Sequence, residues 1–168
     1  GRQGLPGFGQ LSTASIATGG SNPGVQAITE LWDGSSWTEV NNLNTAREQG
    51  GAAGTTTAGI LASGNTGSIT TNAETWDGTS WTEVNNLNAG RVDLRTSGNS
   101  SLSIAFGGAL PSRTGATEFW NGTSWTEVGD MGTARAATAN GIGSSSAALA
   151  AGGSEPSQSA ATEEWEAP

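Results

Sequence analysis

The stretch Glu-Leu-Trp-Asp-Gly-Ser-Ser-Trp-Thr-Glu-Val-Asn-Asn-Leu-Asn-Thr-Ala-Arg, residues 30–47, decides the fold because its pattern returns along the chain. Its two tryptophans are five residues apart, and such a pair recurs every 44 residues. The seven tryptophans are Trp32, Trp37, Trp76, Trp81, Trp120, Trp125 and Trp165. A fixed period of this length indicates an array of equivalent structural units.

Three other kinds of residue keep the same register. An arginine opens each unit, at Arg2, Arg47, Arg91 and Arg135. A glutamate lies two residues before the first tryptophan of each unit, at Glu30, Glu74, Glu118 and Glu163. Glycine doublets recur at 19–20, 107–108 and 152–153, with Ser63-Gly64 in the second unit. We expect each glutamate to accept hydrogen bonds from buried backbone or from the arginines, within a unit or between units.

Within each unit the pattern is typical of short β-strands. Small and β-branched residues alternate with Gly, Ser, Asn and Asp, and no apolar spacing of 3.6 residues extends over ten positions. The second unit predicts four strands, at 47–54, 57–63, 69–76 and 80–85. Asp77-Gly78 predicts a tight hairpin turn between the last two strands, and Asp33-Gly34 and Asn121-Gly122 repeat it. We expect no helix.

Residues 30–47, preceded by a glycine doublet, resemble a kelch repeat. The resemblance covers essentially the whole chain and departs from the family in one respect, since the first aromatic, usually tyrosine, is tryptophan here. The short units rich in Gly, Ser and Thr are similar to kelch-like proteins of marine phages and bacteria. The resemblance implies an all-β propeller of four-stranded antiparallel blades.

The repeat divides the chain into about four blades: 1–45, 46–89, 90–133, and 134–168, which lacks its last strand. Inner strands of a propeller are crowded, which fits the small residues at 52–54 and 136–139. We expect Trp37, Trp81 and Trp125 to be buried between blades, because exposed aromatics at a strict period would form large apolar patches.

The composition argues against catalysis. The chain has no Cys, His or Tyr, and so lacks most common nucleophiles, proton shuttles and soft metal ligands. Copper-radical oxidases built on kelch propellers use Tyr, Cys and His ligands. We therefore expect no enzyme activity, no cofactor and no metal site. The net charge of -9 disfavours nucleic acid as a partner, and no apolar stretch predicts membrane insertion.

Several residues allow a second interpretation. The tryptophans are interpreted as core, but they would also serve as a sugar-stacking surface. The Arg and Glu series is interpreted as structural ion pairs, with a charged channel as the alternative. Asp33, Asp77 and Asp93 are possible Ca²⁺ ligands, although they lack clustered spacing. Residues 1–7 resemble either a collagen-like stalk or, as we prefer, part of the first blade.

These observations predict a non-catalytic propeller module, structural or receptor-binding, in an extracellular assembly such as a phage virion appendage or decoration. The alternative is a secreted bacterial module that binds cell-surface glycan or is adhesive. The ligand-binding residues are unknown, and specificity is expected in the loops that vary between units, at 21–27, 65–70, 109–114 and 154–159.

The alignment of the units also predicts partners. Matching Trp165 to Trp120 leaves the last unit without the residues equivalent to 124–133. An unpaired sheet edge is an aggregation hazard that natural proteins cover. We therefore expect either further blades of a longer chain or other protein subunits, identical or different, to complete the ring.

Overall fold

The computed structural model describes residues 1–136, 142–154 and 157–167, and these residues form strands and no helix. Blade 1 contains β1 (Gly7–Leu11), β2 (Ala14–Thr18), β3 (Thr29–Trp32) and β4 (Trp37–Val40). Blade 2 contains β5 (Gly51–Thr55), β6 (Ala58–Ala62), β7 (Ala73–Trp76) and β8 (Trp81–Val84). Blade 3 contains β9 (Arg95–Gly98), β10 (Ser103–Phe106), β13 (Thr117–Trp120) and β14 (Trp125–Glu127).

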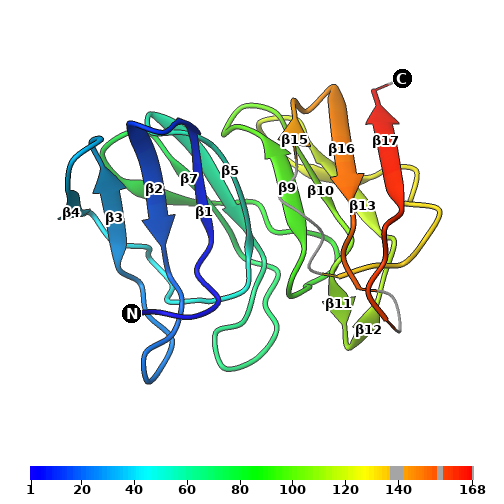
Figure 1. Ribbon diagram of the computed structural model, residues 1–168, viewed down its shortest axis with the longest axis horizontal. Helices are drawn as coiled ribbons and strands as arrows, with labels where there is room; N and C mark the ends of the chain where they lie inside the picture. Colours follow the sequence, from blue (N-terminus) through cyan, green and yellow to red (C-terminus); the bar gives the residue numbers. More distant parts are fainter. Residues whose placement is uncertain (137–141, 155–156, 168) are drawn as a thin grey trace.

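Blade 4 contains β15 (Ile142–Gly143), β16 (Ala147–Ala151) and β17 (Thr162–Glu166). A two-stranded hairpin, β11 (Ala109–Leu110) and β12 (Ser112–Arg113), extends from blade 3. The strands of each blade follow one another in antiparallel order, and the blades form a four-bladed β-propeller. Figure 1 shows blade 1 in blue at one side and blade 4 in orange and red at the other. The predicted fold class is confirmed.

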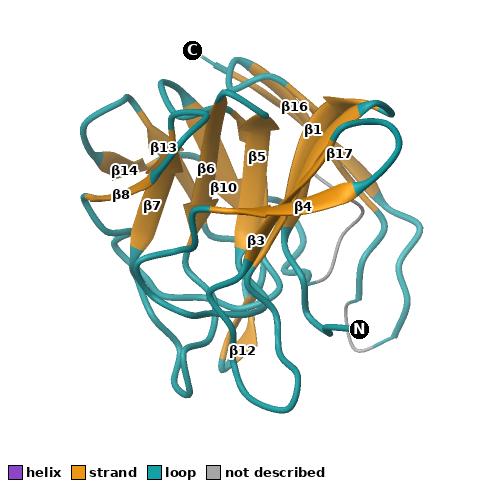
Figure 2. Ribbon diagram, turned by 90° about the vertical axis from the view of Figure 1, so that its left-hand side faces the viewer, coloured by secondary structure: helices purple, strands orange, loops and turns teal. Residues whose placement is uncertain are grey.

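The innermost strands β1, β5, β9 and β15 line one central cavity. In Figure 2 the sheets are seen from the side of blade 1, with β1, β3 and β4 in front. Ala53 on β5 is buried, as expected for a crowded inner strand. The matching expectation for residues 136–139 falls, beyond Ala136, outside the described residues.

The four strands of the second unit start later than predicted, the second and fourth by a single residue and the first and third by four residues, at Gly51 and Ala73. The predicted strand 47–54 begins at Gly51, because Glu48 is used in an isolated bridge to Asn65 and Gln49 has a positive φ of 58°. The predicted strand 69–76 begins at Ala73, because Ile69 is used in a local bridge to Asn65. Repeat position therefore predicts the number of strands better than their ends.

The hairpin before each fourth strand is a four-residue turn closed by its first side chain. Asp33 Oδ1 accepts hydrogen bonds from the amides of Ser35 and Ser36, at 2.8 and 2.9 Å. These hydrogen bonds from Ser36 and Ser35 lower the pKa of Asp33 from its ordinary value to about 2. Asn121 makes the same pair of bonds without a charge. The acidic residue thus has a structural role in the turn that an amide also fulfils.

The hydrophobic core lies in the seams, by which we mean the interfaces between consecutive blades. In the seam between blades 1 and 2, Phe8 and Ile16 pack against Trp76 and Trp81. The rings of Phe8 and Trp81 meet edge to face, with centroids 6.1 Å apart. Each sheet is therefore stabilised mainly by its neighbours, as in other repeat architectures.

We call the seam between blades 1 and 2 and the seam between blades 2 and 3 the internal seams. The indole N–H group of the fourth-strand tryptophan has a hydrogen-bond acceptor in the first of them but not in the second. Trp81 Nε1 donates to Thr29 Oγ1 across the seam at 3.0 Å. Trp125 Nε1 is buried without a partner. The residue equivalent to Thr29 in blade 2 is Ala73, since each pairs with the valine that ends the fourth strand. The missing hydroxyl explains the unpaired indole.

We expect Thr29→Ala to lower the free energy of unfolding by about 1–3 kcal/mol, because it leaves the buried Trp81 N–H unpaired. Ala73→Ser places a hydroxyl beside Trp125 and should raise the stability by up to about 1 kcal/mol. Urea denaturation followed by circular dichroism measures both. A stabilising Thr29→Ala would contradict this account.

Candidate functional site

The periodic arginines and glutamates form one ion pair in each blade: Arg2–Glu30, Arg47–Glu74, Arg91–Glu118 and Arg135–Glu163. Both partners belong to the same blade, which the sequence left open. The two internal pairs are fully buried or nearly so. Burial lowers the pKa of Arg47 and Arg91 below the ordinary arginine value, and the carboxylates of Glu74 and Glu118 offset part of this effect.

Each internal glutamate also holds the preceding blade. Glu74 Oε2 accepts hydrogen bonds from the backbone N and the side-chain Nδ2 of Asn44, at 2.8 and 2.9 Å. Asn88 makes the same two bonds to Glu118. Because these carboxylates are buried and fully used, they are structural and do not line a charged channel.

The glycine doublets lie where the backbones of two blades meet. The amides of Gly20 and Gly64 donate to the carbonyl oxygens of Arg47 and Arg91, both at 2.9 Å. A Cβ on Gly19 would lie 2.2 Å from the Arg47 oxygen, so no side chain fits. Ser63 takes the glycine position in the second unit with a φ of 60°, and its hydroxyl accepts the Arg91 amide at 2.6 Å.

The tryptophans at the internal seams are buried as predicted, with Trp81 5% and Trp125 6% exposed. The prediction is wrong for Trp37, which is 49% exposed. Trp81 and Trp125 pack against the preceding blade, and the described part of the chain places no blade before blade 1. The first tryptophans of the units show the same end effect: Trp76 and Trp120 are buried, whereas Trp32 and Trp165 are half-buried.

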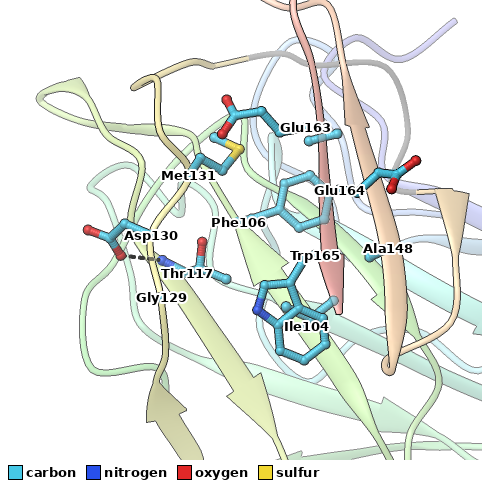
Figure 3. Close-up of a pocket in the computed structure, with 11 residues that line it drawn as sticks. Ile104, Phe106, Thr117, Gly129, Asp130, Met131, Ala148, Glu163, Glu164 and Trp165 are labelled. Carbon is cyan, nitrogen blue, oxygen red and sulfur yellow. Dashed lines mark hydrogen bonds between the residues drawn. The ribbon is translucent and has the colours of Figure 1, made fainter. Parts of the chain in front are cut away.

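The seam between blades 3 and 4 contains a pocket (Figure 3). We call it the slot. Its walls include Ile104, Phe106, Thr117, Met131, Ala148 and Trp165. The slot has an empty volume of about 360 Å³, part of it open to solvent. Trp165 also stacks on Phe119, with ring centroids 6.0 Å apart. Sequence reasoning identified Trp165 but not the residues opposite it.

Polar side chains line a second hollow, next to the first strands of blades 1 to 3. Gln49 and Asp93 adopt positive φ angles of 58° and 54°, equivalent to Gly4 in the first unit. Gln49 Nε2 donates to Asp93 Oδ1 at 3.3 Å. Asp93 therefore takes part in a polar contact between blades. In the described part of the chain, no group of three or more acidic residues could hold a metal ion, so Asp33, Asp77 and Asp93 do not converge.

The variable loops gather at one end of the propeller. Figure 1 shows loops 21–27 and 65–70 and the β11–β12 hairpin at its lower end. The loop at 154–159 lies partly outside the described residues. Residues 1–6 form part of blade 1, because Arg2 Nη1 donates to the carbonyls of Gly19 and Ile28, at 2.7 and 2.6 Å.

Comparisons with known proteins give no family assignment: no model of a protein family and no curated protein sequence matches the chain. In the described residues no helix is long and apolar enough to cross a membrane. The propeller fold thus rests on the structure.

We expect Trp81→Ala to lower the free energy of unfolding by about 3–5 kcal/mol, because it leaves a cavity in a closed seam. Trp37→Ala should cost less than about 1 kcal/mol, because its ring is half exposed. Chemical denaturation of the two variants in parallel tests this difference. Equal losses would show that Trp37 is buried in solution.

The loss of an ion pair should likewise cost more stability in an internal blade than in blade 1. Glu118→Gln leaves the buried Arg91 without its counter-charge, and we expect a loss of about 3–5 kcal/mol. Glu30→Gln should cost less than about 1 kcal/mol, because the Glu30 side chain is 38% exposed. Thermal melts at matched ionic strength compare the two. If Glu118→Gln left the stability unchanged, the ion pair with Arg91 would not be needed for stability.

Proposed function

We propose that this chain is a non-catalytic, kelch-type propeller module, a structural or receptor-binding part of an extracellular assembly such as a phage virion appendage or decoration. The observation that carries the proposal is the exposed face of blade 1. Trp37 lies there in the position that Trp81 and Trp125 occupy inside closed seams. A surface built like the inside of a seam fits either a further blade of a longer chain or a protein partner, and the proposal takes the partner as the case to test.

The opposite face of blade 4 has complementary features. Leu149 and Thr162 occupy the positions of Ile16 and Thr29, since they pair with the equivalent residues in their sheets. Ile142 beside them is 58% exposed. In the first seam, Ile16 and Thr29 receive Trp81. Blade 4 of one copy therefore offers blade 1 of another copy the kind of surface on which Trp81 packs.

The chemistry of the chain supports a binding role. It has no Cys, His or Tyr, and the buried acidic residues Glu74 and Glu118 are held in ion pairs. Acids that are fixed in this way are not available as general acids or bases. The proposed role therefore requires surfaces and no reacting group.

A second candidate function is a secreted bacterial module that binds glycan or acts as an adhesin. The exposed ring of Trp37 favours it, together with the half-buried Trp32 at a centroid distance of 5.5 Å. Flat aromatic faces of this kind stack on sugar rings. In this case the open face of blade 1 would bind cell-surface carbohydrate.

Sedimentation velocity over a concentration series tests the assembly role. We expect the chain to self-associate and Trp37→Ser to weaken the association roughly tenfold or more, as for an interface hot spot. Ile69→Ser removes an exposed apolar side chain at the loop end and should have no effect. A chain that stays monomeric at every concentration would contradict the proposal, and binding to a glycan array that Trp37→Ser abolishes would favour the second candidate.

A further inference from the structure

The turns before the fourth strands differ in one chemical group. Blades 1 and 2 begin this turn with Asp33-Gly34 and Asp77-Gly78, whereas blade 3 begins it with Asn121-Gly122. A side-chain amide followed by glycine cyclises readily, because glycine has no Cβ to hinder attack of its own nitrogen on the amide carbon. Among the described residues, Asn121 is the asparagine that a glycine follows, and Asn140-Gly141 falls outside them.

The hydrogen bonds of the turn activate the Asn121 amide. Its Oδ1 accepts the backbone N–H groups of Thr123 and Ser124, both at 2.9 Å. When a nucleophile adds to Asn121 Cγ, the negative charge that develops falls on this oxygen, and two amides aimed at it stabilise that charge as an oxyanion hole does. The turn is also held in place, because Asn85 Nδ2 donates to the Thr123 carbonyl at 2.7 Å.

The two nitrogens that would react are not engaged by other groups. Neither the Gly122 backbone N–H nor Asn121 Nδ2 donates a hydrogen bond within the described part of the chain. Asn121, Gly122 and Thr123 are all exposed, so water and hydroxide reach the turn. The Gly122 nitrogen can therefore lose its proton to the solvent, and Nδ2 can leave into it.

We propose that the turn at Asn121-Gly122 is a self-modification site, at which the folded chain converts its asparagine to aspartate. The Gly122 nitrogen gives its proton to hydroxide and forms a bond to Asn121 Cγ, while Nδ2 takes up a proton and leaves as ammonia. Water then opens the five-membered imide. Cleavage of the bond to Cγ leaves a carboxylate on a normal backbone, and cleavage of the bond to the main-chain carbonyl carbon leaves an isoaspartyl linkage. No group is oxidised or reduced, and the inference does not depend on the proposed function.

The first two blades show that the turn accepts the aspartate product. Asp77 Oδ1 accepts the amides of Thr79 and Ser80, at 2.7 and 2.8 Å, in the arrangement already described for Asp33. These bonds lower the pKa of both carboxyl groups below the ordinary aspartate value, so a carboxylate in this position is ionised at neutral pH. An ionised carboxylate is a poor electrophile. The product therefore does not cyclise again readily, and the conversion runs in one direction.

The isoaspartyl product fits the turn less well. It adds a carbon atom to the backbone of a hairpin whose strands pair Trp120 with Trp125 at their ends. The longer backbone would move the Thr123 and Ser124 amides away from the carboxylate. We therefore expect the folded chain to give a larger share of normal aspartate than the unfolded chain gives.

The turn at Asn99 is a matched control within the same blade. Asn99 Oδ1 accepts the amides of Ser101 and Leu102, at 2.8 and 3.2 Å, so its oxygen is held as that of Asn121 is. The residue that follows is Ser100, whose Cβ hinders the attack of its nitrogen. Asn99 should therefore keep its amide while Asn121 loses it.

Tryptic peptide mapping by mass spectrometry tests the proposal. Cleavage after arginine places Asn99 in the peptide 96–113 and Asn121 in the peptide 114–135, apart from Asn140. The full chain is incubated at mildly alkaline pH, folded in buffer and unfolded in guanidinium chloride. We expect Asn121 to be converted at least as fast in the folded chain as in the unfolded one, and roughly tenfold or more faster than Asn99. Slower conversion in the folded chain overturns the proposal, because the turn would then protect the amide.

Two variants test the role of the glycine. Ser100→Gly should speed the conversion of Asn99 roughly tenfold or more, and the carbonyl of residue 100 still accepts the Trp120 indole N–H. Gly122→Ala should slow the conversion of Asn121 by a similar factor. It also strains the turn, because Gly122 has a φ of 91° and the added Cβ would lie 3.0 Å from the Ser101 carbonyl oxygen. Circular dichroism checks its folding, and Ser100→Gly tests the same point without that strain.

A third variant tests whether the fold accepts the product. Asn121→Asp should keep the thermal melting temperature of the parent chain, because Asp33 and Asp77 already occupy this position in the other blades. A clearly lower melting temperature would contradict the proposal, as would a Ser100→Gly chain in which Asn99 is converted no faster. Equal shares of normal aspartate from the folded and the unfolded chain would show that the turn does not direct the ring opening.

Discussion

The structure depends on a buried arginine at each seam. The Arg91 guanidinium donates to the carbonyls of Gly107 and Ala116 and pairs with Glu118, which ties the segment before the first strand to the rest of the blade. Its own carbonyl accepts the amide of Gly64 in the preceding blade. A buried charge is costly unless it is paired and hydrogen-bonded, so the contacts of the Arg91 Nη1 and Nη2 atoms fix the register within the blade, and its carbonyl fixes the register between blades.

Because the buried arginines fix how the strands and blades are aligned, the strands themselves can consist of small residues. The strands are short and rich in Gly, Ala, Ser and Thr, and aromatic residues make up only 6% of the chain. The aromatic surface is concentrated in the seams, where one blade contributes two indoles and the other a shallow apolar surface. A blade therefore completes its core only through its neighbours. Among the described residues, blades 1 and 4 each have one face that no other blade covers.

The sequence predicts the features that every unit shares. The period, the Arg and Glu positions and the tight turns all indicate a propeller with repeated ion pairs, and the structure contains them. It does not predict features that depend on a unit's place in the array. Trp37 has the same sequence context as Trp81 and differs only because no described blade covers it. The slot is not predictable for a related reason: Phe106 and Met131 line it only because of how blades 3 and 4 pack in the described residues.

The seams also give the array a direction. Seen along the chain, each blade presents indoles to the blade before it and a receiving surface to the blade after it. Blade 1 therefore exposes indoles, whereas blade 4 exposes the receiving positions of Leu149 and Thr162. Two identical faces of this kind do not match each other, because indoles would meet indoles. Contacts between copies through these faces must then be heterologous, closing into a ring when the rotation per copy allows and otherwise growing into a filament.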